Sequence, residues 1–258
     1  MGFGNSPKKE IAMHRFFVDE SQVSKDEIYI LGTDVNHIKN VLRMKIDEEI
    51  VISCGEKLEY TCRIKDITDS EVVATIEYIQ EAGVELKSKI YLFQGLPKSD
   101  KMELIIQKAV ELGVYQIIPV AMKRSVVKLD SKKEATKLKR WQGSSESAAK
   151  QAKRMIIPEV TKVQSFARAL AHAAKLDIRL MPYERAENIA DTKSFLNTIK
   201  PGQSIGIFIG PEGGFAEEEV ESAMANEVKT ITLGKRILRT ETAGITMLSI
   251  LMFLMEEA

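Results

Sequence analysis

The sequence predicts an α/β protein with a small N-terminal β-barrel and a larger C-terminal domain, in which helices cover a mostly parallel sheet. Short β-like runs fill residues 13 to about 80, a polar segment around Gly83 follows, and β-like and helical patterns then alternate. Such alternation is typical of a parallel sheet with helical connections. We therefore expect one domain over residues 13–83 and a second over 84–258, with residues 1–12 as a flexible extension before Met13.

The N-terminal domain is predicted to be mostly β-structure. Its β-like runs are rich in Val, Ile, Thr and Tyr, and turn residues such as Gly55 and Asp69 separate them. One short helix is expected over residues 34–42, with Asp34 as its N-cap. The expected strands cover residues 15–18, 47–53, 59–67 and 71–79.

In the C-terminal domain, each β-like run is followed by a helical pattern or a loop. Apolar residues such as Met102 and Ile105 recur at helical spacing, and Asp100 with Glu103 resembles a capping box before them. The expected strands cover residues 89–93, 115–120, 177–181, 204–209 and 228–233, and the expected helices cover residues 100–112, 131–154, 166–174, 216–225 and 242–256.

The composition excludes several classes of protein. A hydrophobic content of 44% is sufficient for a core, so the chain is not disordered. Two cysteines cannot form a disulfide scaffold and three scattered histidines offer no ligand spacing, so we expect no metal site and a reducing, cytoplasmic setting. The longest apolar run, residues 243–255, is too short to span a membrane, and residues 1–12 lack the apolar region of a signal peptide.

A glycine-rich loop follows the β-like run at residues 204–209, a place where open α/β sheets bind ligands. Its sequence, Gly-Pro-Glu-Gly-Gly at 210–214, matches neither the dinucleotide nor the P-loop spacing. The acids at 217–219 suit a helix N-terminus but would repel a phosphate there. The loop therefore favours a ligand that is poor in phosphate; a tight turn with glycines for packing is the alternative.

Charged residues mark two further candidate sites. Arg236, Arg239 and Glu241 follow the last β-like run, and either a binding site or a capped loop with a local Arg–Glu pair explains them. Residues 123–154 carry eleven Lys or Arg and only three acids, although the whole chain has a net charge of zero. Such a stretch supports salt-sensitive nucleic-acid binding, and an ordinary solvated helix is the alternative.

Taken together, these motifs resemble the ribosomal RNA small subunit methyltransferase E family, which belongs to the SPOUT class of knotted RNA methyltransferases. The matching stretches occur in order between Met13 and Met255. They lie at residues 14–18, 37–44, 95–103, 107–113, 124–128, 151–154, 210–214 and 236–243. The chain departs from the family over residues 142–149, where Gly143 and three serines lower the helix propensity.

The resemblance implies both a fold and a reaction. It implies an N-terminal PUA-like or OB-like β-barrel that helps to hold RNA, and a C-terminal SPOUT domain with a trefoil knot, a rare exception to the rule that chains do not thread loops. The implied cofactor is S-adenosylmethionine, which carries no phosphate. The implied reaction is methylation of uridine N3 in 16S small-subunit ribosomal RNA, either free or in the assembled subunit.

The cofactor is expected to bind across three loops, each of which follows a β-like run. No metal is expected to take part in the transfer. The expected cofactor-binding residues are Pro182, Tyr183, Ile209, Gly210, Pro211, Glu212, Gly213, Gly214, Leu233, Gly234, Ile237, Leu238, Thr242 and Ala243.

Uracil N3 carries a proton that must leave before or during methyl transfer. We expect Arg239 to stabilise the developing negative charge and Glu241 or Glu212 to take the proton; a purely structural role of Glu241, which would hold Arg239 in place, stays open. The residues expected to bind RNA are Arg15, Lys98, Lys101, Arg124, Lys128 and Arg154.

The apolar residues of the terminal helix, 242–256, go most of the way round it, so we expect a homodimer that covers its outer side. Burial of this helix inside one subunit is the alternative. Two other functions also stay open: a SPOUT methyltransferase that modifies another base or the ribose 2′-oxygen, and a non-catalytic, ribosome-associated RNA-binding protein.

Overall fold

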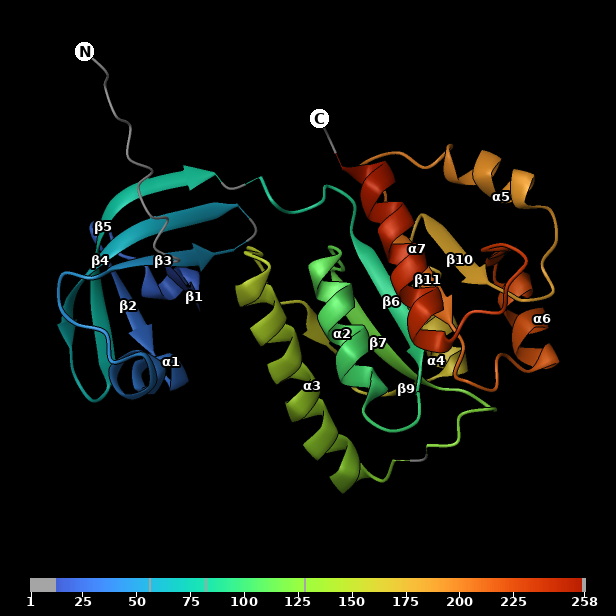
Figure 1. Cartoon of the computed structure of the whole chain (residues 1–258), viewed down its shortest axis with the longest axis horizontal. Coiled ribbons are helices and arrows are strands. Elements are labelled where there is room, and N and C mark those ends of the chain that lie inside the picture. The colour runs from blue at the N-terminus through green and yellow to red at the C-terminus, as the bar shows by residue number, and fades with distance from the viewer. Residues whose placement is uncertain (1–12, 56, 82, 128, 257–258) are drawn as a thin grey trace, which may run out of the picture. The chain divides into compact units, whose positions relative to one another are not determined.

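The structure is a computed structural model that describes residues 13–55, 57–81, 83–127 and 129–256. The chain divides into two compact units, with the boundary between Gly83 and Val84 (Figure 1). The expected extension at residues 1–12 lies outside the described residues. Within the described ranges, no helix is long and apolar enough to cross a membrane.

The N-terminal unit is a curled five-stranded sheet, in which the strand order is β1-β3-β4-β5-β2. β1 pairs with β3 in parallel, and the other neighbours are antiparallel. Of these strands, the sequence pattern missed β2. The strands are β1 (His14–Val18), β2 (Glu27–Leu31), β3 (Glu49–Cys54), β4 (Leu58–Ile67) and β5 (Glu71–Glu81).

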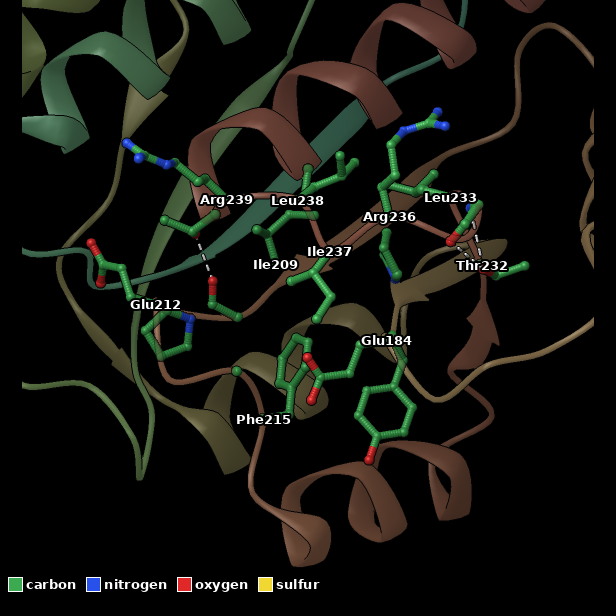
Figure 2. Close-up of a pocket in the computed structure, with 18 of the residues that line it drawn as sticks. Glu184, Ile209, Glu212, Phe215, Thr232, Leu233, Arg236, Ile237, Leu238 and Arg239 are labelled. Carbon is green, nitrogen blue, oxygen red and sulfur yellow. Dashed lines mark hydrogen bonds between the residues drawn. The ribbon is translucent and has the colours of Figure 1, made fainter.

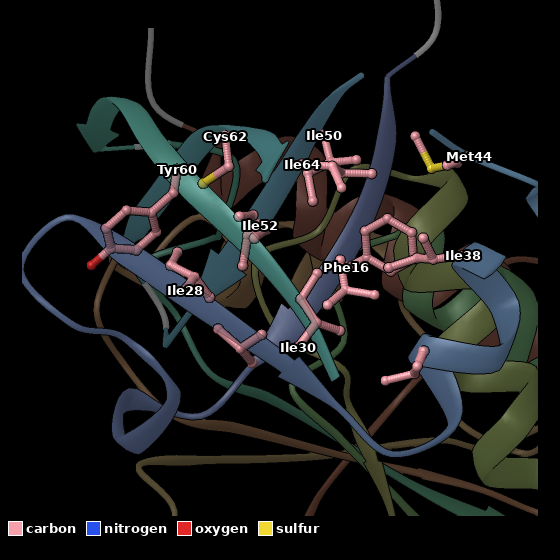
Figure 3. Packing of buried hydrophobic residues seen from close by; sticks show 14 of the residues in the cluster. Phe16, Ile28, Ile30, Ile38, Met44, Ile50, Ile52, Tyr60, Cys62 and Ile64 are labelled. Atoms are coloured by element: carbon pink, nitrogen blue, oxygen red, sulfur yellow. The ribbon is translucent and has the colours of Figure 1, made fainter. Parts of the chain in front are cut away.

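A single core explains why these strands curl. Alternate residues of β1 and β2 are buried, and side chains such as Phe16, Ile28 and Ile50 meet inside the unit (Figure 3). The predicted helix begins as α1 (Thr33–Asn36) and continues as a π-helix, His37–Leu42. The prediction that Asp34 is the N-cap is wrong: the helix starts after Gly32, without a side-chain cap.

The C-terminal unit has the predicted parallel sheet, and every described strand pair in it is parallel. The strand order is β12-β10-β11-β6-β7-β8, and β9 also pairs with β7. The trefoil knot that the resemblance implies stays a prediction. The strands are β6 (Ile90–Gly95), β7 (Gln116–Ala121), β8 (Glu159–Val160), β9 (Gln164–Ser165), β10 (Ile178–Pro182), β11 (Ile205–Ile209) and β12 (Lys229–Ile231).

Helices pack against this sheet, and α7 crosses in front of the strands in Figure 1. α7 contacts α2 and β11, whereas α4 and α6 join a separate core cluster around the stacked rings of Phe93 and Phe208. Of the helices, the sequence pattern missed α5. The helices are α2 (Lys101–Glu111), α3 (Ser131–Gln151), α4 (Phe166–Ala173), α5 (Ile189–Leu196), α6 (Glu217–Ala225) and α7 (Thr240–Met255).

The start of α2 and the middle of α3 differ from the sequence expectations. The Asp100 side chain makes no capping hydrogen bond, and Glu103 pairs instead with Arg140 of α3 at 3.1 Å. α3 continues through its Gly- and Ser-rich segment, where the buried Ser145 hydroxyl donates to the Pro158 carbonyl oxygen at 2.6 Å. Tertiary contacts therefore override the weak local preference for a helix.

Arg154 is an internal anchor of the C-terminal unit. Its guanidinium donates to Glu85 through Nη2 at 2.6 Å and to the carbonyl oxygens of Val110 at 2.7 Å and Val114 at 3.1 Å. Glu85 also accepts from the main-chain nitrogen of Met155 at 2.7 Å. Because only 5% of the Arg154 side chain is exposed, the prediction that it binds RNA is wrong.

We predict that Arg154→Met lowers the free energy of unfolding by about 3–5 kcal/mol, because it leaves Glu85 as a buried charge without its partner. Urea denaturation measures this loss. Lys133→Met is the control, since Lys133 is 70% exposed and its surface ion pair with Asp130 should contribute little to stability. Equal effects of the two substitutions would contradict the anchoring role of Arg154.

Candidate functional site

Three loops enclose a pocket of about 400 Å³ at the carboxyl edge of the parallel sheet (Figure 2). They follow β10, β11 and β12, which are neighbours in the sheet order, so their ends meet at one place. Residues 182–184, 209–215 and 232–240 supply nearly all of the lining. This edge is where open α/β sheets bind ligands.

The pocket combines apolar walls with a glycine-rich loop. Ile209 and Phe215 are buried in one wall, whereas Ile237 lines the pocket although 85% of it is exposed (Figure 2). Gly214 has a φ of +68°, a left-handed conformation that favours glycine, and no atom occupies the space where its side chain would be. Gly95 allows another close approach, because a Cβ there would lie 2.7 Å from Pro211. The walls therefore suit a ligand with a flat apolar part.

Acidic side chains at the start of α6 oppose the binding of a phosphate there. Glu219 accepts from the main-chain nitrogen of Ala216 at 2.9 Å and from that of Lys123 at 2.8 Å. Two more acids, Glu217 and Glu218, stand in the same first turn. The expectation of a ligand poor in phosphate agrees with this arrangement.

Thr240 joins the glycine-rich loop to α7 and β6. Its hydroxyl donates to the Gly210 carbonyl oxygen at 2.6 Å and accepts from Gln94 Nε2 at 2.9 Å. Neither Thr240 nor Glu241 caps α7, because the helix already includes both residues and its N-cap position is Arg239. The Thr240 hydroxyl instead fixes two sides of the pocket to each other.

Lys101, at the start of α2, lies between two carboxylates. Its Nζ atom is 3.2 Å from Glu212 Oε1 and 3.3 Å from Glu241 Oε2. Burial opposes ionisation of Glu212, but hydrogen bonds from its own main-chain nitrogen, from that of Lys98 and from Lys101 outweigh burial and lower the pKa of Glu212. Interaction with Glu212 raises the pKa of Lys101, and Glu241 adds to this effect. Glu212 and Lys101 are therefore both charged at neutral pH.

Exposed cations surround the same pocket. Lys235, Arg236 and Arg239 line it and are exposed to solvent. Figure 2 shows Arg239 on the same side as Glu212, with Arg236 on the opposite side. The pocket therefore presents both acidic and basic groups to a ligand.

The structure brings most of the predicted cofactor residues together around this pocket. Thr242 and Gly213 do not line it: Thr242 is exposed on α7, and a Cβ on Gly213 would lie 3.0 Å from Arg124 Cβ. The sequence prediction missed lining residues that stand next to predicted ones, so extending each loop by one or two residues would have found them. They are Glu184, Phe215, Thr232, Lys235, Arg236 and Thr240.

The residues predicted to bind RNA have different surroundings. Lys98 and Arg124 are exposed in the C-terminal unit, Lys101 is engaged with the two carboxylates, and Lys128 lies outside the described residues. The Arg15 side chain is only 10% exposed in the N-terminal unit, where it pairs with Glu59 at 2.5 Å. This ion pair engages the Arg15 guanidinium, and its expected contact with RNA stays a prediction.

Acids pair with several cations of the basic stretch over residues 123–154. Besides Arg154, four of its cations have acidic partners: Lys123 pairs with Glu218, Lys133 with Asp130, Arg140 with Glu103 and Lys150 with Glu146. The described part of the stretch is therefore a weaker anion-binding face than the sequence indicates. In addition, no group of three or more His, Cys, Asp or Glu that could hold a metal occurs among the described residues.

Comparisons with known proteins match nearly the whole chain. A family model described as an RNA methyltransferase domain matches residues 84–252, and one described as an RNA methyltransferase PUA domain matches residues 30–77. The "Ribosomal RNA small subunit methyltransferase E" of Bacillus subtilis is 36% identical over 92% of this chain and 95% of its own length.

Two further relatives carry the same name. The protein of Mesomycoplasma hyopneumoniae is 36% identical over 92% of this chain and 98% of its own length. The crystal structure of the Neisseria gonorrhoeae protein, bound to S-adenosyl methionine, has a TM-score of 0.79 and 31% identity over 94% of this chain and 98% of that one.

We predict that Thr240→Val lowers the free energy of unfolding by about 1–3 kcal/mol, because it leaves the Gly210 carbonyl and one Gln94 N–H group without a partner in a buried place. Thr240→Ser keeps the hydroxyl and should lose less than half as much. Urea denaturation of both variants tests this. Equal losses would show that the methyl group contributes as much as the hydroxyl, and would contradict the leading role of the two hydrogen bonds.

Proposed function

Because this chain belongs to the ribosomal RNA small subunit methyltransferase E family, we propose that it transfers a methyl group from S-adenosylmethionine to N3 of a uridine in 16S small-subunit ribosomal RNA. The observation that carries the proposal is the pocket formed by the loops after β10, β11 and β12. It has apolar walls and carboxylates, and three acids stand in the first turn of α6, which follows one of the lining loops.

The pocket residues fit S-adenosylmethionine. The apolar side chains of Ile237 and Leu238 would cover the adenine, and Glu184 and Glu212 offer acceptors to the ribose hydroxyls or the ammonium group. The bound cofactor supplies a methyl group that its sulfonium makes electrophilic. No metal is needed for such a transfer, so the chain's main tasks are to position the acceptor base and exclude water.

The acceptor base has to lose a proton, and charged residues of the pocket supply that chemistry. Glu212 and Glu241 are the two candidate bases, and a role of Glu241 in holding its neighbours is the alternative for that residue. Arg239 lines the pocket on the side of Glu212 and would stabilise negative charge on the uracil oxygens (Figure 2). Lys98 and Arg124 are the exposed cations that we propose for the RNA phosphates.

Methyl transfer to small-subunit RNA, with and without ribosomal proteins, tests the function. Mass spectrometry of the digested nucleosides should show N3-methyluridine. We propose that the protein acts in the cytoplasm. Methylation of another base or of the ribose 2′-oxygen would replace the proposed product. Calorimetry tests the other alternative, since a non-catalytic RNA-binding protein need not bind S-adenosylmethionine.

We predict that Arg239→Ala retains affinity for S-adenosylmethionine but loses most of its turnover. The guanidinium is proposed to act on charge that develops only during the reaction, so kcat should fall while cofactor affinity changes little. Calorimetry and single-turnover kinetics separate the two effects. A near-normal kcat in the variant would contradict the role of Arg239.

We also propose that the chain forms a homodimer through α7. This helix buries Met247, Leu248 and Leu251 within its own unit, but Phe253 is 79% exposed. Beside Phe253, α5 and α7 border an apolar groove of about 500 Å³. A second subunit would remove this apolar surface from water.

We predict that the protein sediments at micromolar concentration with twice the 28.9 kDa mass of one chain. Phe253→Glu should give single chains, because it places a charge in the proposed interface. Val126→Glu, at another exposed apolar residue, should leave the dimer intact. A wild-type mass of one chain that persists as the concentration rises would exclude the dimer.

A further inference from the structure

Lys101 connects three segments of the C-terminal unit that are far apart in sequence. It is the first residue of α2, Glu212 lies in the loop after β11, and Glu241 lies in the first turn of α7. Lys101 and Glu212 line the pocket, whereas Glu241 stands behind Lys101 and does not line it. The ammonium group therefore separates a carboxylate that faces the pocket from one that does not.

The two carboxylates are close to each other because one Nζ atom reaches both. Lys101 Nζ lies 3.2 Å from Glu212 Oε1 and 3.3 Å from Glu241 Oε2, so the distance between these two oxygens is no greater than the sum of the two contacts. Two carboxylates at such a distance repel, and without a cation one of them tends to keep a proton. The Lys101 ammonium group lies within 3.3 Å of both carboxylates and compensates this repulsion.

The two carboxylates differ in their hydrogen bonds. Glu212 accepts from the Lys98 main-chain nitrogen at 3.1 Å, which holds its carboxylate at the wall of the pocket. Glu241 Oε2 is buried and has no hydrogen bond, since its contact with Lys101 lacks the geometry of one. Glu212 is thus the carboxylate in a position to meet a ligand, and Glu241 is the counter-charge that holds Lys101.

We propose that Lys101 is a positioning residue that keeps Glu212 and Glu241 ionised as one unit, and that Glu212 is the member that takes the N3 proton from the substrate uridine. The proposal rests on the function proposed above. As the proton moves to a Glu212 oxygen, the electron pair of the N–H bond stays on N3 and forms the bond to the methyl carbon. The carbon–sulfur bond breaks with its electron pair on sulfur, and Glu212 then returns the proton to water.

The other charged groups around Lys101 are already engaged or stand at the rim. Asp100 and Glu103, in the same turn of the chain, both pair with Arg140 of α3, at 3.7 Å and 3.1 Å. Arg239 precedes α7 and is exposed. Lys98 approaches Glu212 through its main-chain nitrogen and has an exposed side chain. Lys101 is therefore the cation whose side chain bridges the two carboxylates.

Carbon-13 NMR of glutamate-labelled protein tests the proposal without any reaction, with Glu212→Gln used to assign the signal. In the wild type, Glu212 should titrate below the ordinary pKa of glutamate. In Lys101→Met, its pKa should rise by about one unit or more, because the repulsion is no longer compensated. In Lys101→Met with Glu241→Gln the pKa should fall again, since the second charge is absent. Lys101→Arg should behave like the wild type.

Single-turnover methylation at saturating RNA supplies the second measurement. A general base works only when it is ionised, so the methylation rate falls as the pH drops through the pKa of Glu212. This acid limb of the pH–rate profile should move to higher pH in Lys101→Met. It should return towards the wild-type position in Lys101→Met with Glu241→Gln. Lys139→Met removes an exposed positive charge on α3, away from the two carboxylates, so its acid limb should not move.

Three results would overturn the proposal: a wild-type Glu212 that titrates at or above the ordinary value, a Glu212 pKa unchanged in folded Lys101→Met, or no reversal by Glu241→Gln. Failure of the wild type to methylate uridine N3 would instead reject the proposed function. In that case the NMR titration would still report whether Lys101 controls the carboxylate pair.

Discussion

Parallel pairing of β12, β10 and β11 is the constraint on which the rest of the site depends. It brings the carboxyl ends of three strands to one edge, where loops over residues 182–184, 209–215 and 232–240 enclose the pocket. Hydrogen bonds then fix the loops, since the Thr240 hydroxyl joins the Gly210 carbonyl to Gln94 of β6. The pocket is therefore a product of strand order, and its backbone is set before any ligand binds.

In this protein, many charged side chains form local ion pairs, so clusters of like charge in the sequence are weaker charged surfaces in the structure. Along the sequence, residues 123–154 form a basic block, but in the structure acids from other segments bind much of it, such as Glu103 at Arg140 and Glu218 at Lys123. Around the pocket the reverse holds: Lys235, Arg236 and Arg239 lie outside the basic block in sequence, and all three are exposed residues of the lining. Exposed cations beside carboxylates suit an RNA base whose proton must leave.

The elements that the sequence analysis missed are short and depend on their neighbours. β2 has only five residues and is stabilised by pairing with β5, with Ile28 and Ile30 in the core. The N-cap of α5 is Asn188, whose side chain accepts from the main-chain nitrogens of Ala190 and Asp191, and this N-cap was the signal available in the sequence. Asp34 does not cap α1, because that helix begins one residue earlier, at Thr33. Asp100 stands at the N-cap position of α2 but makes no capping hydrogen bond, and its carboxylate pairs with Arg140 instead.

The sequence by itself determined the family, the parallel sheet, the two-part organisation of the elements and most of the lining of the pocket. These features follow from local patterns: β-like runs that end in glycine-rich loops, and motifs in a fixed order. Only the tertiary structure decided which charges are free. Arg15 and Arg154 are exposed cations by residue type, yet each is buried against a glutamate distant in sequence, Glu59 and Glu85. Lys101 bridges two carboxylates for the same reason: ion pairs depend on distance in space, which the order of residues does not give.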